Sequence, residues 1–217
     1  LWHSLTGPHQ HFATGTNNAK HYPFTVTFGA ALKNNTDDEL RELASMIEPE
    51  QVVGLFGITE NSTEEWITLF STKIVQMVCP ERIPALKHDV DILTLTTDDV
   101  SDMLDLIKLT EPGPLEVRTI EMGPYIGIRQ NNQLVAMAGS RMFTPHYREI
   151  SAVCTHPDYR GKGYARLLTS ILVNRYFDEG ITPFLHAAPD NTNAIHLYEK
   201  LGFIHNHKIG LLVVQRN

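Results

Sequence analysis

The chain has 217 residues, of which 42% are hydrophobic and 20% are charged, a composition typical of a folded globular protein rather than a disordered one. Its net charge of −7 at pH 7 argues against nucleic acid as a partner, because phosphate binding requires a basic face. No apolar run approaches the ~20 residues that cross a bilayer, so no membrane partner is expected, and the two cysteines, both in apolar runs, favour a cytoplasmic location over a disulfide framework.

The first part of the chain predicts an αβ region without recognisable chemistry. Thr36 and Glu39 have the spacing of a capping box, and the apolar residues that follow recur at helical spacing. A second capping-box pattern at 62–65 precedes an apolar stretch from Trp66 and predicts another helix. The expected strands are 23–30, 52–56 and 73–78. We therefore expect residues 1–87 to form a smaller N-terminal αβ subdomain.

The rest of the chain alternates strands and helices more regularly. A helix is expected after Thr97, and Asn131-Asn132 tolerates positive φ and suits a tight hairpin turn. Strands 149–155 and 182–187 are joined by a helix over 163–177, so they should be parallel. The other expected elements are strands 91–95, 125–129, 134–138, around 203 and 209–214, and a helix over 191–201.

The stretch 153–165 carries the clearest chemical signal. A strand ends there, and a loop with Gly161 and Gly163 opens into an amphipathic helix whose first turn offers free amides and a positive dipole end. Glycines lack a Cβ atom, so a diphosphate can approach the backbone closely, and Arg160 and Lys162 add positive charge. An ordinary strand-to-helix turn that uses glycines for geometry alone is the alternative.

Two other phosphate-binding patterns do not fit this loop. The nucleotide P-loop pattern G-x-x-x-x-G-K-[ST] is absent from the chain. The dinucleotide fingerprint G-x-G-x-x-G would need a glycine or alanine at Arg166, and it normally follows the first strand of its fold. The loop therefore indicates a different kind of phosphate ligand.

Two stretches taken together resemble the GNAT superfamily of N-acetyltransferases. Residues 160–165, R-G-K-G-Y-A, match its R/Q-x-x-G-x-G/A signature, and residues 191–203 resemble its second signature, N-x-x-A-x-x-L-Y-x-x-x-G-F. The two occur in the family's order, with one helix and one strand between them. The resemblance covers residues 88–217, which we expect to form a GNAT acetyltransferase domain. Residues 1–87 are matched only loosely, as in glycine N-acyltransferase-like relatives that carry an extra N-terminal half.

The resemblance implies an α/β fold, in which a mixed central sheet flanked by helices binds acetyl-CoA between two splayed parallel strands. Backbone groups of 153–155 pair with the pantetheine arm as an added strand would, and the amides of 161–166 hold the pyrophosphate. Asn191 contacts the pantetheine or its neighbouring phosphate. The implied CoA-binding residues are Val153, Cys154, Thr155, Arg160, Gly161, Lys162, Gly163, Tyr164, Ala165, Arg166, Asn191 and Tyr198.

The resemblance also implies acetyl transfer to a primary amine of a small molecule or peptide, by direct transfer in a ternary complex. Tyr198 would protonate the departing thiolate, since a phenol pKa near 10 lies above that of a thiol. The amide of Val153 would stabilise the oxyanion. The alternative for Tyr198 is a plain core position on its helix.

The general base is predicted less directly. Glu149 starts the CoA-binding strand, in a position similar to the strand glutamate of histone acetyltransferases. Alternation puts Glu149, Ser151 and Val153 on one face, and an acid aimed at an apolar cleft has a raised pKa, which suits a base. The alternative is a solvated carboxylate paired with Arg148 or Arg141.

Several other residues have less specific interpretations. Cys154 is expected to be a small buried hydrophobe rather than an acyl-carrying nucleophile. The pairs His9/His11 and His205/His207 lack a third ligand at useful spacing, so surface or strand histidines and no metal are expected. An amino-acid N-acyltransferase that uses another acyl-CoA, and a non-catalytic acetyl-CoA sensor, stay open as alternative functions. The sequence indicates neither the acceptor nor the oligomeric state.

Overall fold

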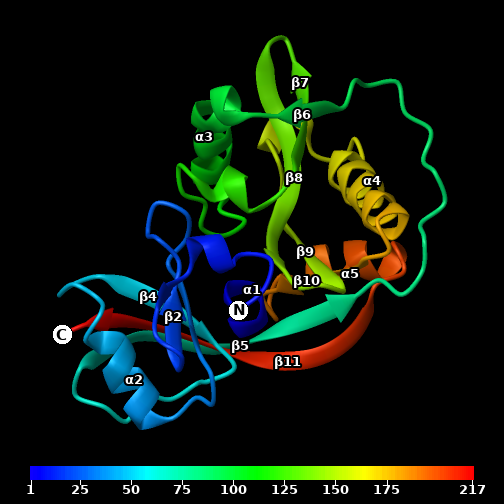
Figure 1. Ribbon diagram of the computed structural model, residues 1–217. Helices are drawn as coiled ribbons and strands as arrows, with labels where there is room; N and C mark the ends of the chain where they lie inside the picture. Colours follow the sequence, from blue (N-terminus) through cyan, green and yellow to red (C-terminus); the bar gives the residue numbers. More distant parts are fainter.

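One continuous sheet of eleven strands, with helices on both faces, runs through the computed structural model, which describes all of residues 1–217 (Figure 1). The strand order is β1-β2-β3-β4-β11-β5-β10-β9-β8-β7-β6. The strands are β1 (Thr14–Gly15), β2 (Ala19–His21), β3 (Gly29–Leu32), β4 (Val52–Phe56), β5 (Trp66–Val78), β6 (Leu93–Leu95), β7 (Tyr125–Gln130), β8 (Gln133–Phe143), β9 (Tyr147–Thr155), β10 (Thr182–Ala187) and β11 (Ile204–Arg216). This mixed α/β architecture confirms the predicted fold class.

The helices are short compared with the sheet, and none is both long and apolar enough to cross a bilayer. The α-helices are α1 (Trp2–Leu5), α2 (Asp37–Ala44), α3 (Val100–Thr110), α4 (Tyr164–Asp178) and α5 (Thr192–Lys200). Four 3₁₀ turns are η1 (Gln10–Phe12), η2 (Thr97–Asp99), η3 (Thr119–Met122) and η4 (Pro157–Tyr159). Figure 1 shows α3 and α4 on opposite sides of the β7–β10 part of the sheet.

The two longest strands join the halves of the chain. β5 pairs with β11 along nearly its whole length and with β10 on its other edge, while β11 also pairs with β4. A strand from the first 87 residues therefore lies between two strands from the last third, and the sheet is continuous across residue 87. The division at residue 87 stays a prediction about how the chain is organised.

β9 and β10 are parallel, as predicted, but they pair over only part of their length. The register runs from Thr182 opposite Tyr147 to Phe184 opposite Glu149 and then stops. β10 continues to Ala187 paired with β5 on its other edge. The last six residues of β9 thus face a gap where β10 has diverged, which is the splay that the family resemblance implies.

A β-bulge bends β9 where the two strands diverge. Ala152 has φ of 52°, and the register with β8 shifts between Ser151 and Cys154. An extra residue in a strand reverses the alternation of side chains beyond it. Val153 accordingly packs in the apolar cluster under α4 together with Ile150, while Cys154 packs in the cluster under α3. The expectation that Glu149 and Val153 share a face is therefore wrong.

Apolar packing against both faces holds this part of the sheet in place. Leu168, Leu172 and Val173 of α4 are fully buried against strand residues on one face. On the other face Met103 and Leu106 of α3 pack in a second cluster that includes strand side chains. Each such burial contributes roughly 1.5–3 kcal/mol, so the walls of the gap between β9 and β10 are fixed by core packing.

The N-terminal region contains one confirmed helix and one wrong prediction. The Thr36 capping box is present, with the Thr36 hydroxyl accepting from Glu39 N–H at 3.3 Å, and α2 follows it. The pattern at 62–65 begins no helix, because the Asn61 side chain accepts the Thr63 N–H and strand β5 starts at Trp66. The β-branched and aromatic residues of 66–78 favour a strand, and pairing with both neighbours outweighs the local helical signal.

Smaller differences concern element ends. Thr96 rather than Thr97 caps the turn before α3: its hydroxyl accepts from the Asp98 N–H, and the Asp99 carboxylate accepts from the Thr96 N–H. Only the end of the predicted strand 23–30 is in a strand, β3, and the two predicted C-terminal strands are the single strand β11. Asn131 and Asn132 have φ of 51° and 66°, which confirms the predicted hairpin turn.

Candidate active site

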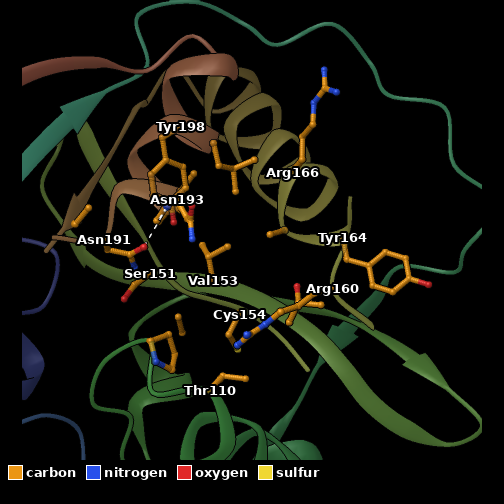
Figure 2. Close-up of a pocket in the computed structure, with 18 of the residues that line it drawn as sticks. Thr110, Ser151, Val153, Cys154, Arg160, Tyr164, Arg166, Asn191, Asn193 and Tyr198 are labelled. Carbon is orange, nitrogen blue, oxygen red and sulfur yellow. Dashed lines mark hydrogen bonds between the residues drawn. The ribbon is translucent and has the colours of Figure 1, made fainter. Parts of the chain in front are cut away.

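The gap between β9 and β10 opens into a cavity of about 820 Å³ bounded by β9, the start of α4 and α5 (Figure 2). Of the twelve predicted CoA-binding residues, all but Lys162 line it. These are Val153, Cys154, Thr155, Arg160, Gly161, Gly163, Tyr164, Ala165, Arg166, Asn191 and Tyr198. The Lys162 ammonium instead lies 4.8 Å from the ring centroid of Tyr159. The two sequence signatures, some thirty residues apart, thus meet at one cavity.

The loop before α4 has the geometry of an anion site. Gly161 and Gly163 both have φ of 79°, a left-handed conformation that L side chains rarely adopt. Leu167 N–H donates to Gly163 O at 2.9 Å, so the amides of 164–166 have no acceptor inside the helix. Free amides, a helix dipole and an accessible backbone favour a diphosphate at this end of the cavity.

Residues of α5 form the opposite wall. Asn191 caps the helix through its side-chain oxygen, which accepts from Ala194 N–H at 3.1 Å. Tyr198 is 7% exposed and makes no side-chain hydrogen bond within the protein. Burial raises the pKa of Tyr198 to about 12. Figure 2 shows Tyr198 and Asn191 gathered around the same cavity as Ser151 and Val153 of β9. The Tyr198 phenol is therefore a protonated group facing the cavity at neutral pH.

Glu149 lies at the point where β9 and β10 stop pairing, and its carboxylate accepts four hydrogen bonds. Its carboxylate accepts from Arg141 Nε and Nη2 at 3.1 and 2.9 Å, from Met142 N–H at 3.3 Å and from His186 Nδ1 at 2.8 Å. Burial by itself would raise the pKa of Glu149, but the Arg141 guanidinium and the His186 bond outweigh it and hold the pKa well below its usual range.

This network corrects the sequence argument about Glu149. The expected rise in its pKa does not occur, because a cation lies beside the carboxylate rather than an apolar wall. The alternative pairing with Arg141 is present, although the pair is buried rather than solvated: Glu149 is 1% exposed. A carboxylate with four donors and a low pKa is a weak base, and it is well placed to orient its neighbours.

His186 is the functional candidate that sequence reasoning missed. It lies on β10 and lines the cavity beside Ala187. Its Nδ1 donates to Glu149, and its Nε2 accepts from the side-chain amide of Gln76 at 3.2 Å, whose own oxygen accepts from Asn206. A carboxylate can only accept, so these bonds assign the neutral tautomer with its lone pair on Nε2.

Cys154 is buried, as expected, whereas His9 lies in surroundings that were not expected. Burial raises the pKa of the Cys154 thiol to about 11, so the thiolate needed for nucleophilic attack is scarce at neutral pH. His9 was expected to be a surface or strand residue, but it is buried. Its Nδ1 is hydrogen-bonded to the Tyr22 hydroxyl at 2.9 Å, and its Nε2 to Met122 O at 3.0 Å. It joins the N-terminal segment to the turn before β7.

Comparisons with known proteins agree with this architecture. The family model described as FR47-like protein matches residues 125–209, from β7 into β11. Spermidine N(1)-acetyltransferase of Vibrio cholerae is 41% identical over 54 residues, a segment that spans 22% of this chain and 29% of that protein. A GNAT-family structure from Novosphingobium aromaticivorans is 28% identical, with a TM-score of 0.91 over 100% of this chain and 96% of its own.

A GCN5-related N-acetyltransferase from Kribbella flavida is 13% identical with a TM-score of 0.68 over 99% of this chain and 93% of its own, a likeness of fold. The splayed strands, the glycine loop and these neighbours define an enzyme of the acyltransferase class. These relatives and neighbours are acetyltransferases, and the chain has the fold of the GNAT structures together with both sequence signatures of that superfamily, as expected.

Proposed function

We propose that the protein transfers the acetyl group of acetyl-CoA directly to a primary amine in a ternary complex. The observation that carries the proposal is the convergence, in one cavity, of the glycine loop at α4, the unpaired edge of β9 and the Tyr198 phenol. Acetyl-CoA supplies the acetyl group as a thioester. The protein has to bind it, aim it, stabilise the charge that develops and move two protons.

Binding is assigned mainly to backbone groups. The edge of β9 over 153–155 has no strand partner on its β10 side and pairs with the amide-bearing pantetheine arm. The amides of 161–166, with Arg160 beside them, hold the diphosphate. Asn191 contacts the arm where α5 begins. The acyl end of the thioester then lies toward the end of the cavity that holds His186 and Arg141.

A residue of β9 is assigned to stabilise the negative charge, and a residue of α5 is assigned to protonate the leaving group. The N–H of Val153, next to the bulge, donates to the thioester oxygen as negative charge develops on it. Tyr198 gives its proton to the departing sulfur. Its pKa of about 12 keeps the phenol protonated at neutral pH, so a proton donor faces the sulfur as the C–S bond breaks and negative charge develops there.

We assign His186 as the base that accepts the proton from the amine, and Glu149 as the residue that positions His186. The His186 Nε2 lone pair, held by the Gln76 amide in the free protein, accepts from the incoming amine in place of that amide. Glu149 fixes the ring through Nδ1 and stabilises the imidazolium that forms. A positioned base of this kind typically contributes about 10²–10⁴ in rate.

The first test combines calorimetry with acetyl-CoA and thiol release in the presence of primary amines. We expect binding and amine-dependent release by the parent protein. The Tyr198→Phe variant should keep its affinity for acetyl-CoA and lose at least about tenfold in kcat, because only the proton donor is removed. The matched control is Tyr147→Phe, at an exposed position outside the cavity, with unchanged kcat.

Three outcomes decide between the functions considered. No acetyl-CoA binding would overturn the proposal. Binding without release from any amine would support a non-catalytic sensor instead. Equal kcat for Tyr198→Phe and the parent would remove Tyr198 from the reaction and leave it as a core residue of α5.

A further inference from the structure

A second cavity of about 230 Å³ adjoins the first on the side of the N-terminal region. The two cavities share a wall made by Pro112, Arg141 and the β10 end from His186 to Ala188. The group assigned to receive the amine proton therefore faces both. An acceptor that occupied the second cavity would present its amine at His186, opposite the thioester. This inference rests on the proposed function and names its acceptor class.

The second cavity is mostly apolar. Its main side chains are Phe28, Phe56, Ile74, Met122, Met142 and Leu211. Three of these six come from the first 87 residues, so the N-terminal region builds much of a wall that the GNAT motifs do not provide. The Phe56 ring lies 5.7 Å from the His186 ring, which places apolar surface directly beside the proposed base.

No free anion faces this cavity. Arg141 is the one lining side chain with a permanent charge, and it is a cation. Glu149 lies behind Arg141 and His186, but it is 1% exposed and already accepts four hydrogen bonds. Arg141 uses Nε and Nη2 on Glu149, and its Nη1 has no acceptor in the protein. The cavity thus offers no unpaired carboxylate to a second positive charge.

We infer that the acceptor is a primary amine on an apolar body that carries no second cationic group. An ammonium placed in this cavity would lose its hydration without gaining a carboxylate, which is strongly unfavourable. An apolar chain gains free energy from the same burial. The acceptor class therefore differs from the polyamine in the name of the Vibrio cholerae relative.

The test uses two amines that differ only in the second charge, n-pentylamine and 1,5-diaminopentane. With the parent protein, kcat/KM from thiol release should be at least about tenfold higher for n-pentylamine. Equal values, a preference for 1,5-diaminopentane, or release with spermidine but not n-pentylamine would overturn the inference while leaving the proposed function intact. Failure to bind acetyl-CoA would overturn both.

A specificity switch sharpens the result. Phe56→Glu puts a carboxylate in the wall and should shift the ratio of kcat/KM at least about tenfold toward 1,5-diaminopentane, with acetyl-CoA affinity unchanged. The matched control is Ile67→Glu on β5, 48% exposed and outside both cavities, with no shift. If Phe56→Glu fails to fold, the Phe56→Ala variant replaces it. This variant should raise KM for n-pentylamine and leave KM for 1,5-diaminopentane unchanged. An unchanged ratio in Phe56→Glu, or an unchanged KM in Phe56→Ala, would contradict the assignment.

Discussion

The two cavities that meet at His186 are encoded in different ways. The larger one is lined by two short sequence stretches and depends mainly on backbone: a strand edge, left-handed glycines and the first turn of a helix. The smaller one takes single side chains from β4, β5, β8, β10 and β11. A backbone site leaves a motif in the sequence because glycines and caps are local. A side-chain site assembled from distant strands leaves none.

The largest expected effect is at the junction of the two cavities. His186→Asn removes the ring nitrogen assigned to the amine proton and should lower kcat by about 10²–10⁴, with the affinity for acetyl-CoA unchanged. The control is His205→Asn, an exposed histidine that is bonded to Glu199 and lines neither cavity, with parent activity. Full activity of His186→Asn would return the base role to another group.

The next effect is on stability. Glu149→Gln leaves Arg141, whose side chain is 18% exposed, without its counter-ion and should lower the free energy of unfolding by up to about 3–5 kcal/mol, measured in urea. Replacing both partners, Arg141→Met with Glu149→Leu, should cost less than Glu149→Gln alone, since no charge is left unpaired. The reverse order would show that the pair is not the main interaction of Glu149.

A backbone change should separate the larger cavity from the smaller. Gly163→Val forces a β-branched residue into a left-handed conformation, which costs about 1–2 kcal/mol, and should weaken acetyl-CoA binding about tenfold or more. Gly180→Val carries the same kind of strain, at φ of 72° beyond the end of α4, and should lose similar stability with no change in acetyl-CoA affinity. Equal acetyl-CoA affinity in both variants would contradict the assignment of the loop.

The last effect concerns His9, in the N-terminal region, at acid pH. Burial lowers the pKa of His9 to about 4, below its ordinary value of 6.5, so the unfolded chain binds a proton that the folded protein excludes. Stability from this group is complete above pH 6.5 and falls as the pH drops toward 4, by at most about 1.4 kcal/mol per pH unit. In urea unfolding between pH 4.5 and 7, His9→Gln should show a smaller slope than the parent. An identical slope would mean that His9 is protonated when folded.

Much of the fold was predictable, because the signals for it are local. The parallel strands around α4, the Thr36 capping box and the turn at Asn131 were all predicted and are all present. The capping-box pattern at 62–65 misled, because long-range pairing of β5 with β10 and β11 decides the state of that segment. Pairing between distant strands has no signature in the residues just before a strand.

The candidate site was predictable only where its residues belong to a sequence motif. Eleven of the twelve expected CoA-binding residues line one cavity, and the exception is Lys162. The network of Glu149, Arg141 and His186 was not foreseen as a whole, because it depends on the register that sets Phe184 opposite Glu149 and on the path of β10 beyond it. The bulge at Ala152 also reverses the alternation of side chains between the two faces of β9 beyond that residue.

The central claim is that thioester and amine are held together, in joined cavities, when the acetyl group moves. A matrix of initial rates over acetyl-CoA and n-pentylamine concentrations tests it most directly. Double-reciprocal lines that intersect are expected, since both substrates must be bound before thiol is released. Parallel lines would indicate that thiol leaves before the amine binds, with the acetyl group held on the protein, and would contradict the account.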